Sequence, residues 1–176
     1  MKLSPVQEKF VLHWGKMGTQ WGINRTVAQI HALLFISEKP IHAEEIAQTL
    51  TVARSNVSSS LRELQGWGII KTVHVMGDRR DHYESIKDVW ELFRVVLDER
   101  KRREIDPTLE LLRECVAEAD KARAEPHTRA RLHDLLGFFE TMASWYGHVR
   151  SLPTPAVIKF IKLGDRLGKF LGGGGP

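Results

Sequence analysis

Small polar residues and arginines stand out between residues 54 and 66. Val57, Leu61 and Leu64 recur at spacings of three and four, so a helix over this stretch places them on one face. The rest of the helix then presents polar side chains that can form hydrogen bonds: Arg54, Ser55, Asn56, Ser58, Ser59 and Arg62. Such side chains can contact base edges and phosphates in the major groove of DNA. An ordinary solvated helix face is the alternative interpretation.

A second charged group follows in the sequence Gly77-Asp78-Arg79-Arg80-Asp81. Glycine and aspartate together favour a chain reversal, so these residues are predicted to form the tip of a β-hairpin. Guanidinium groups at such a tip can enter a minor groove of DNA, where the negative potential attracts arginine. A solubilising turn is the alternative, but a polar helix followed by a basic hairpin favours DNA binding.

The elements that position these residues are predicted to be mainly helical. Apolar spacing predicts four helices, over 5–20, from a cap at Asn24 to about 37, over 43–50 and over 54–66. The first of them is expected to turn inward Val6, Phe10, Trp14, Met17 and Trp21. Residues 69–75 and 82–86 are predicted as the strands of the hairpin, 69–75 being rich in β-branched side chains. The order of helix, turn, helix and hairpin predicts a winged helix-turn-helix module over residues 1–87.

Beyond residue 88 the pattern is helical, with prolines as punctuation. Asp106-Pro107 predicts an N-cap where a long helix restarts, Pro126 separates a helix over about 128–148, and a last helix from Thr154 ends at Gly172. One apolar stripe is larger than the small module can cover: Leu109, Leu112, Val116 and Ala119. We therefore predict that residues 88–171 form a helical dimerisation and effector region, with an intramolecular bundle as the alternative. The glycine-rich residues 172–176 are expected to be disordered.

Composition excludes several classes of protein. The chain has 176 residues, 42% hydrophobic and 27% charged, which predicts a soluble, folded protein. No apolar run suits a membrane span or a secretory leader, and Cys115 is the single cysteine, so a cytoplasmic location is expected. The histidines lack metal-ligand spacing, and the motifs of phosphate loops, nucleophile elbows and paired catalytic carboxylates are missing. We therefore expect no enzyme, no cofactor and no metal site.

The net charge of +4 says little about DNA binding. Its whole excess lies in residues 150–176, where five lysines and arginines accompany only Asp165, and the preceding residues are balanced. A winged helix that binds another protein, without specific DNA binding, therefore remains an alternative.

The sequence resembles the GbsR branch of the MarR-type regulators. The resemblance is carried by Trp21-Gly22 to Arg25, Pro40 with Glu44-Glu45-Ile46-Ala47, Asn56-Val57-Ser58 with Leu61-Arg62-Glu63-Leu64, Trp67-Gly68, and Gly77-Asp78-Arg79-Arg80 with Tyr83-Glu84. It implies a homodimeric transcriptional regulator, expected to act as a repressor on pseudo-palindromic double-stranded DNA. It also implies DNA contacts from Asn56, Ser58 and Arg62, and an Asp-x-Arg element at Asp78 and Arg80. Helices in such domains usually begin with a residue whose side-chain hydroxyl caps the helix. This chain departs from that pattern at two helix starts, where it has His42 and Ala53.

Aromatic residues suggest a place for a small-molecule effector. Some relatives in the resembling family respond to the quaternary ammonium compound choline, and aromatic faces hold such cations. The candidate effector-binding residues are Trp21, Trp90, Phe93, Trp145 and Tyr146. Packing in a core is the alternative for each of them.

Overall fold

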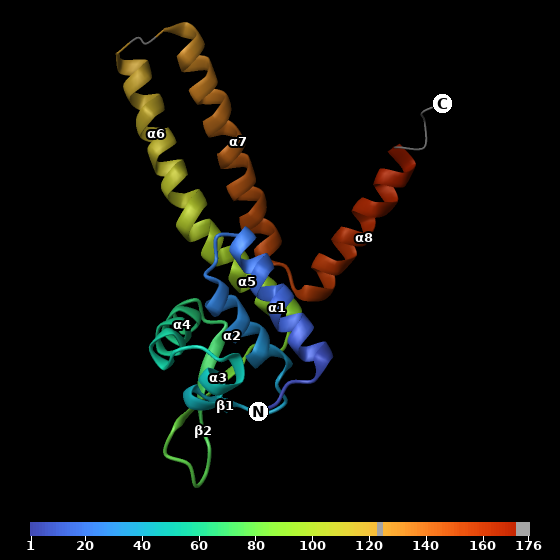
Figure 1. Cartoon of the computed structure of the whole chain (residues 1–176). Coiled ribbons are helices and arrows are strands. Elements are labelled where there is room, and N and C mark those ends of the chain that lie inside the picture. Colours follow the sequence, from blue (N-terminus) through green and yellow to red (C-terminus); the bar gives the residue numbers. More distant parts are fainter. Residues whose placement is uncertain (123–124, 172–176) are drawn as a thin grey trace. The chain divides into compact units, whose positions relative to one another are not determined.

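The structure is a computed structural model that describes the backbone of residues 1–122 and 125–171, and side chains as far as residue 164. Its elements are mainly helices, with one small antiparallel sheet (Figure 1), which confirms the predicted fold class. The chain divides into two compact units, Met1–Leu97 and Asp98–Pro176. The division therefore falls ten residues beyond the predicted border at residue 87. The tail predicted to be disordered, 172–176, lies outside the described residues.

The first unit contains the helix-turn-helix and the hairpin. Its helices are α1 (Pro5–Gln20), α2 (Arg25–Ile36), α3 (Ala43–Leu50), α4 (Arg54–Gly66) and the first part of α5 (Val89–Arg100); its strands are β1 (Ile41–His42), β2 (Ile70–His74) and β3 (Asp81–Ser85). Ser4 begins α1 through a capping box with Gln7. Asn24 caps α2 as predicted, accepting a hydrogen bond from the Thr26 backbone at 2.8 Å.

The core of the first unit surrounds α2, in which every residue from 27 to 34 is buried. Ile30 and Leu33 of this helix, Ile46 of α3 and Leu64 of α4 are all fully buried in one hydrophobic cluster. Burial of one such side chain contributes about 1.5–3 kcal/mol to stability. This packing fixes the orientation of α4, and thus of its polar face.

The prediction of which residues of α1 face inward is partly wrong. Val6 and Trp21 are 78% and 54% exposed, whereas Val11 and two glycines, Gly15 and Gly18, are buried. A Cβ atom at Gly15 would lie 2.5 Å from Cγ of Gln29, and one at Gly18 would lie 2.5 Å from Cβ of Ala28. The two helices therefore approach closely through the glycines, and a search for large apolar residues does not detect such a contact.

The sheet has the order β1-β3-β2, with both pairs antiparallel. Thr72 lies opposite Tyr83 in the hairpin, close to the predicted strands. The sequence did not predict β1, in which Ile41 also lies opposite Tyr83, because two residues are too few for a periodic pattern. This strand joins the start of α3 to the hairpin.

In the second unit the end of α5 continues through a π-helical turn, Lys101–Ile105, into α6 (Asp106–Lys121). Asp106 is therefore not the predicted N-cap, since its backbone is itself helical at φ −61° and ψ −46°. The wider turn accommodates Pro107 without a break in the chain. The basic run at residues 100–103 pairs locally with Glu99, Glu104 and Asp106, which leaves it an ordinary helix surface.

Helix α7 (Pro126–Ser151) runs beside α6 as a helical hairpin, and α8 (Thr154–Leu171) follows (Figure 1). The predicted stripe of Leu109, Leu112, Val116 and Ala119 is buried on α6, whereas α7 contains no buried residue. None of the described helices has the length and apolar character that a membrane span requires.

Candidate nucleic-acid interface

A tight turn sets the angle between α3 and α4. Thr51 ends α3 in the left-handed conformation at φ 55°, and the Val52 amide donates to the Ala47 carbonyl at 3.1 Å. Only Thr51, Val52 and Ala53 separate the two helices. This is the geometry of a helix-turn-helix, in which the second helix enters the major groove.

Helix α4 has a buried apolar face and an exposed polar face. Val57, Leu61 and Leu64 are at most 2% exposed. The six predicted contact residues are all exposed: Arg54, Ser55, Asn56, Ser58, Ser59 and Arg62. The Arg62 guanidinium makes only long hydrogen bonds, at 3.4 Å to the Ser58 carbonyl and 3.5 Å to Ser59 Oγ. Its side chain is therefore weakly held along the helix and can extend from it.

Neither α3 nor α4 begins with a hydroxyl cap, and an ion pair joins the first turns of the two helices. Nδ1 of His42 accepts a hydrogen bond from the Glu45 amide at 3.2 Å, so an imidazole caps α3. No side chain caps α4 at Ala53. Instead, the Arg54 guanidinium at its first residue forms an ion pair with the Glu44 carboxylate. These partners hold the first turns of both helices together.

The hairpin tip holds one arginine in a defined position. Gly77 has φ 83°, and the Asp78 amide closes the turn on the Val75 carbonyl at 3.0 Å. The Asp78 carboxylate accepts hydrogen bonds from the Arg80 amide at 3.0 Å and from Arg80 Nε at 2.9 Å. These bonds hold the pKa of Asp78 well below its usual range and raise the pKa of Arg80.

Sequence analysis missed a histidine behind this pair. His82 on β3 is 7% exposed, and its Nε2 lies 3.5 Å from the Asp78 carboxylate. Its Nδ1 lies 3.0 Å from the Arg80 carbonyl. Arg79 is exposed, and so is Met76, at 101%. Thus the tip presents one fixed arginine, one unconstrained arginine and one methionine.

A polar groove connects the start of α4 with the hairpin. It has a volume of about 210 Å³ and is lined by His42, Ala43, Glu44, Arg54, Ser58, Arg80, Asp81 and Tyr83. The structure therefore brings together predicted residues from the helix and from the tip. The groove also contains His42, Glu44 and Tyr83, which sequence analysis did not assign to the site. Their place depends on β1, which the sequence did not predict.

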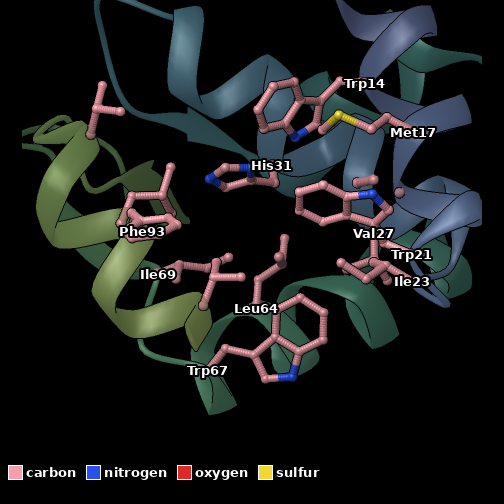
Figure 2. A pocket seen from close by; sticks show the side chains of 15 residues that line it. Trp14, Met17, Trp21, Ile23, Val27, His31, Leu64, Trp67, Ile69 and Phe93 are labelled. Carbon is pink, nitrogen blue, oxygen red and sulfur yellow. The ribbon is translucent and has the colours of Figure 1, made fainter. Parts of the chain in front are cut away.

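The five candidate effector residues do not form one cluster. Trp21 and Phe93 line a second cavity of the first unit, together with Trp14 and Trp67 (Figure 2). The ring of Trp90 contacts that of Phe93 edge-on, with centroids 6.5 Å apart, but Trp90 does not line the cavity. Trp145 and Tyr146 belong to α7 in the second unit, where Tyr146 donates a hydrogen bond to Asp98 at 2.7 Å.

No group of three His, Cys, Asp or Glu side chains within the described part of the chain could hold a metal ion. Cys115 is half-buried on α6.

The fold and the polar surface define a winged helix-turn-helix protein. Residues 21–81 match the model described as the MarR family, so this segment is similar to that family. None of the curated proteins matches the chain.

Three solved structures are similar to parts of this chain. One described as a transcriptional regulator is 21% identical, with a TM-score of 0.65, over 83% of this chain and 96% of its own. A complex of Staphylococcus aureus MepR with DNA is 16% identical over 66% of this chain and 92% of its own, with a TM-score of 0.38. MepR alone is described as a transcription regulator of the multidrug efflux pump MepA. It is 14% identical over 80% of this chain and 93% of its own, also with a TM-score of 0.38.

Proposed function

We propose that this protein is a DNA-binding transcriptional regulator that acts as a homodimeric repressor on a pseudo-palindromic operator. The observation that carries the proposal is the polar groove, where Arg80, fixed by Asp78, lies beside the exposed start of α4. The MarR-family match over residues 21–81 supports the same function. The residues that carry the resemblance to the GbsR branch favour that branch.

In this proposal α4 lies in the major groove. Asn56 and Arg62 suit hydrogen bonds to base edges, and the serines beside them suit phosphate oxygens. The hairpin then reaches the neighbouring minor groove with Arg79 and Arg80. Because Asp78 already orders the Arg80 side chain, binding loses less rotamer entropy there than at a mobile arginine.

The helical hairpin of the second unit supports dimerisation. Leu135, Phe138, Met142 and Trp145 are each at least 44% exposed and recur on α7 at helical spacing. Exposed apolar stripes of this kind mark interaction surfaces, and a second copy of the chain can cover them. A two-fold axis would place two copies of α4 about 34 Å apart, one turn of DNA.

A winged helix that binds a protein partner is the second candidate function. The observation that favours it is the acidic component of the groove, where Glu44 and Asp81 accompany the arginines. Protein partners tolerate such mixed charge better than a phosphate backbone does.

Selection of genomic fragments on the full chain tests the proposal. We expect enrichment of an inverted repeat whose half-sites are centred about 10 base pairs apart. The matched control is the Arg62→Ala variant, which should lose this enrichment. Recovery of unrelated fragments by both proteins would contradict sequence-specific regulation and favour the protein-binding alternative.

A further inference from the structure

The apex of the hairpin formed by β2 and β3 carries an apolar side chain that is fully exposed to solvent. Met76 is 101% exposed, and the neighbouring Val75 is 40% exposed. Figure 1 shows the connection between the two strands projecting from the sheet of the first unit. Single exposed apolar side chains are common on protein surfaces, so exposure alone indicates no function. The position of Met76 within the hairpin tip carries the argument.

A tight turn sets that position. The Asp78 amide donates to the Val75 carbonyl at 3.0 Å, and Gly77 has φ 83°. A hydrogen bond across four residues, with a positive φ at the third of them, is the pattern of a type II turn. Met76 therefore occupies the first central position of a turn whose backbone is closed by its own hydrogen bond.

The residues that follow the apex are held by side-chain contacts. The Asp78 carboxylate accepts hydrogen bonds from the Arg80 amide at 3.0 Å and from Arg80 Nε at 2.9 Å. His82, which is 7% exposed, places Nδ1 3.0 Å from the Arg80 carbonyl. A side chain can deform DNA only when the element that carries it does not yield first. These contacts give the hairpin tip that support, because they tie the apex to the buried part of β3.

The neighbours of Met76 indicate its partner. Arg79 and Arg80 belong to the same tip, and the proposed function, on which this step rests, places that tip in a minor groove of DNA. Phosphates and base edges are polar, so an apolar side chain gains little from them. The faces of the bases are apolar, and they become accessible where a base step opens. Methionine is unbranched and adaptable, and it is among the side chains that minor-groove proteins insert between base steps.

We infer that Met76 is a wedge that enters a base step of the minor groove beside the half-site and bends the duplex. A pyrimidine–purine step such as TA kinks easily, whereas an A-tract is stiff, so the wedge favours DNA whose flanks contain TA steps. Arginines alone favour the opposite flank, because the narrow minor groove of an A-tract attracts them. A wedge and a pair of arginines therefore predict opposite flank preferences.

Fluorescence anisotropy of the full chain with two duplexes tests the wedge. Both duplexes carry the inverted repeat recovered by genomic selection, one flanked by TA steps and the other by A-tracts, and dyes at their two ends report bending by energy transfer. We expect the wild type to bind the TA-flanked duplex about fivefold more tightly, the lower end of the effect of one base pair. It should also bend this duplex by about 20° or more.

Three variants assign the effect to Met76. Met76→Ala should lose both the flank preference and the bend, whereas Met76→Leu should keep them, because leucine also serves as a wedge. Val6→Ala, at a 78% exposed position of α1, is the matched control and should behave as the wild type. The Met76 side chain buries no surface in the folded chain, so its truncation should leave the circular dichroism and the urea midpoint unchanged.

Failure of the wedge and failure of DNA binding give different results. The wedge is refuted, and sequence-specific binding stands, if the wild type binds the repeat with equal affinity on both flanks or prefers the A-tract. A flank preference that persists in Met76→Ala refutes the wedge as well. If the wild type binds neither duplex more tightly than an unrelated sequence, the wedge and the proposed regulator function both fail.

Discussion

The two units differ in how completely they bury their apolar residues. In the first unit, α2 is buried along eight consecutive residues and contacts α1, α3, α4 and the sheet. In the second, α6 buries one stripe against α7, and no residue of α7 is buried at all. The first unit therefore has a core of its own, whereas the second exposes apolar side chains on α7.

We expect this difference to separate two roles within one chain. A unit with a complete core holds side chains at fixed positions, as Asp78 and Arg80 require at the hairpin tip. A helical hairpin with an uncovered stripe is suited to association. The predictions below test this division, from the largest expected effect to the smallest.

Truncation of a core leucine should have the largest effect. Leu33 is 0% exposed, so Leu33→Ala should lower the free energy of unfolding by about 2–5 kcal/mol, through lost burial and a residual cavity. Leu135 on α7 is 45% exposed, and the same truncation there should cost about 0.5 kcal/mol or less in dilute, monomeric protein. Urea unfolding followed by circular dichroism measures both. Equal losses would contradict the contrast between the units.

The pH dependence of stability should report the burial of His31 in the first unit. His31 has a pKa of about 4 in the folded chain and about 6.5 when unfolded, so the unfolded chain binds the proton first as the pH falls. The stability due to neutral His31 is complete above pH 6.5 and is lost between 6.5 and 4, by about 3 kcal/mol.

The measurement is urea unfolding at several pH values for the wild type and for His31→Gln. The variant should lack the loss between pH 6.5 and 4, while a matched His148→Gln variant should keep it. Parallel pH profiles for wild type and His31→Gln would show that the imidazole is not buried as described.

A charge introduced among the exposed apolar side chains of α7, Leu135, Phe138, Met142 and Trp145, should weaken the proposed dimer. Phe138→Glu places a carboxylate in the middle of the stripe, and we expect the dimer to dissociate at concentrations at least tenfold higher than for the wild type. Ser144→Glu, at another exposed position of α7, is the control. Light scattering across a dilution series distinguishes them, and a monomeric wild type at micromolar concentration would refute the dimer.

Sequence analysis predicted the parts of the fold that periodic patterns encode. The α4 face was correct because Val57, Leu61 and Leu64 repeat at helical spacing, and the hairpin was correct because glycine precedes Asp78. The inner face of α1 was partly wrong because glycines make the close contact. The two-residue strand β1 was missed, and with it the places of His42 and Tyr83 in the groove. Such contacts join residues distant in sequence, which no local pattern records.

Loss of the aspartate at the hairpin tip should have the smallest effect. Asp78→Asn removes the charge that fixes Arg80, and we expect severalfold weaker DNA binding with little change in stability, because both residues lie near the surface. Asp134→Asn on α7, which removes an exposed aspartate paired with Arg131, is the matched control. Fluorescence anisotropy with an operator duplex measures the affinity; tighter binding by Asp78→Asn would show that the carboxylate opposes DNA rather than positions Arg80.

The most direct test of the central claim is the salt dependence of DNA affinity, compared between the wild type and the double variant Arg62→Ala, Arg80→Ala. We predict that log affinity falls linearly with log salt, and that the double variant binds more weakly with a slope lower by about 1–2, since each lost phosphate contact removes about 0.9. Arg131→Ala on α7, far along the chain from α4, should match the wild type. Identical affinities and slopes for all three proteins would contradict DNA binding through α4 and the hairpin.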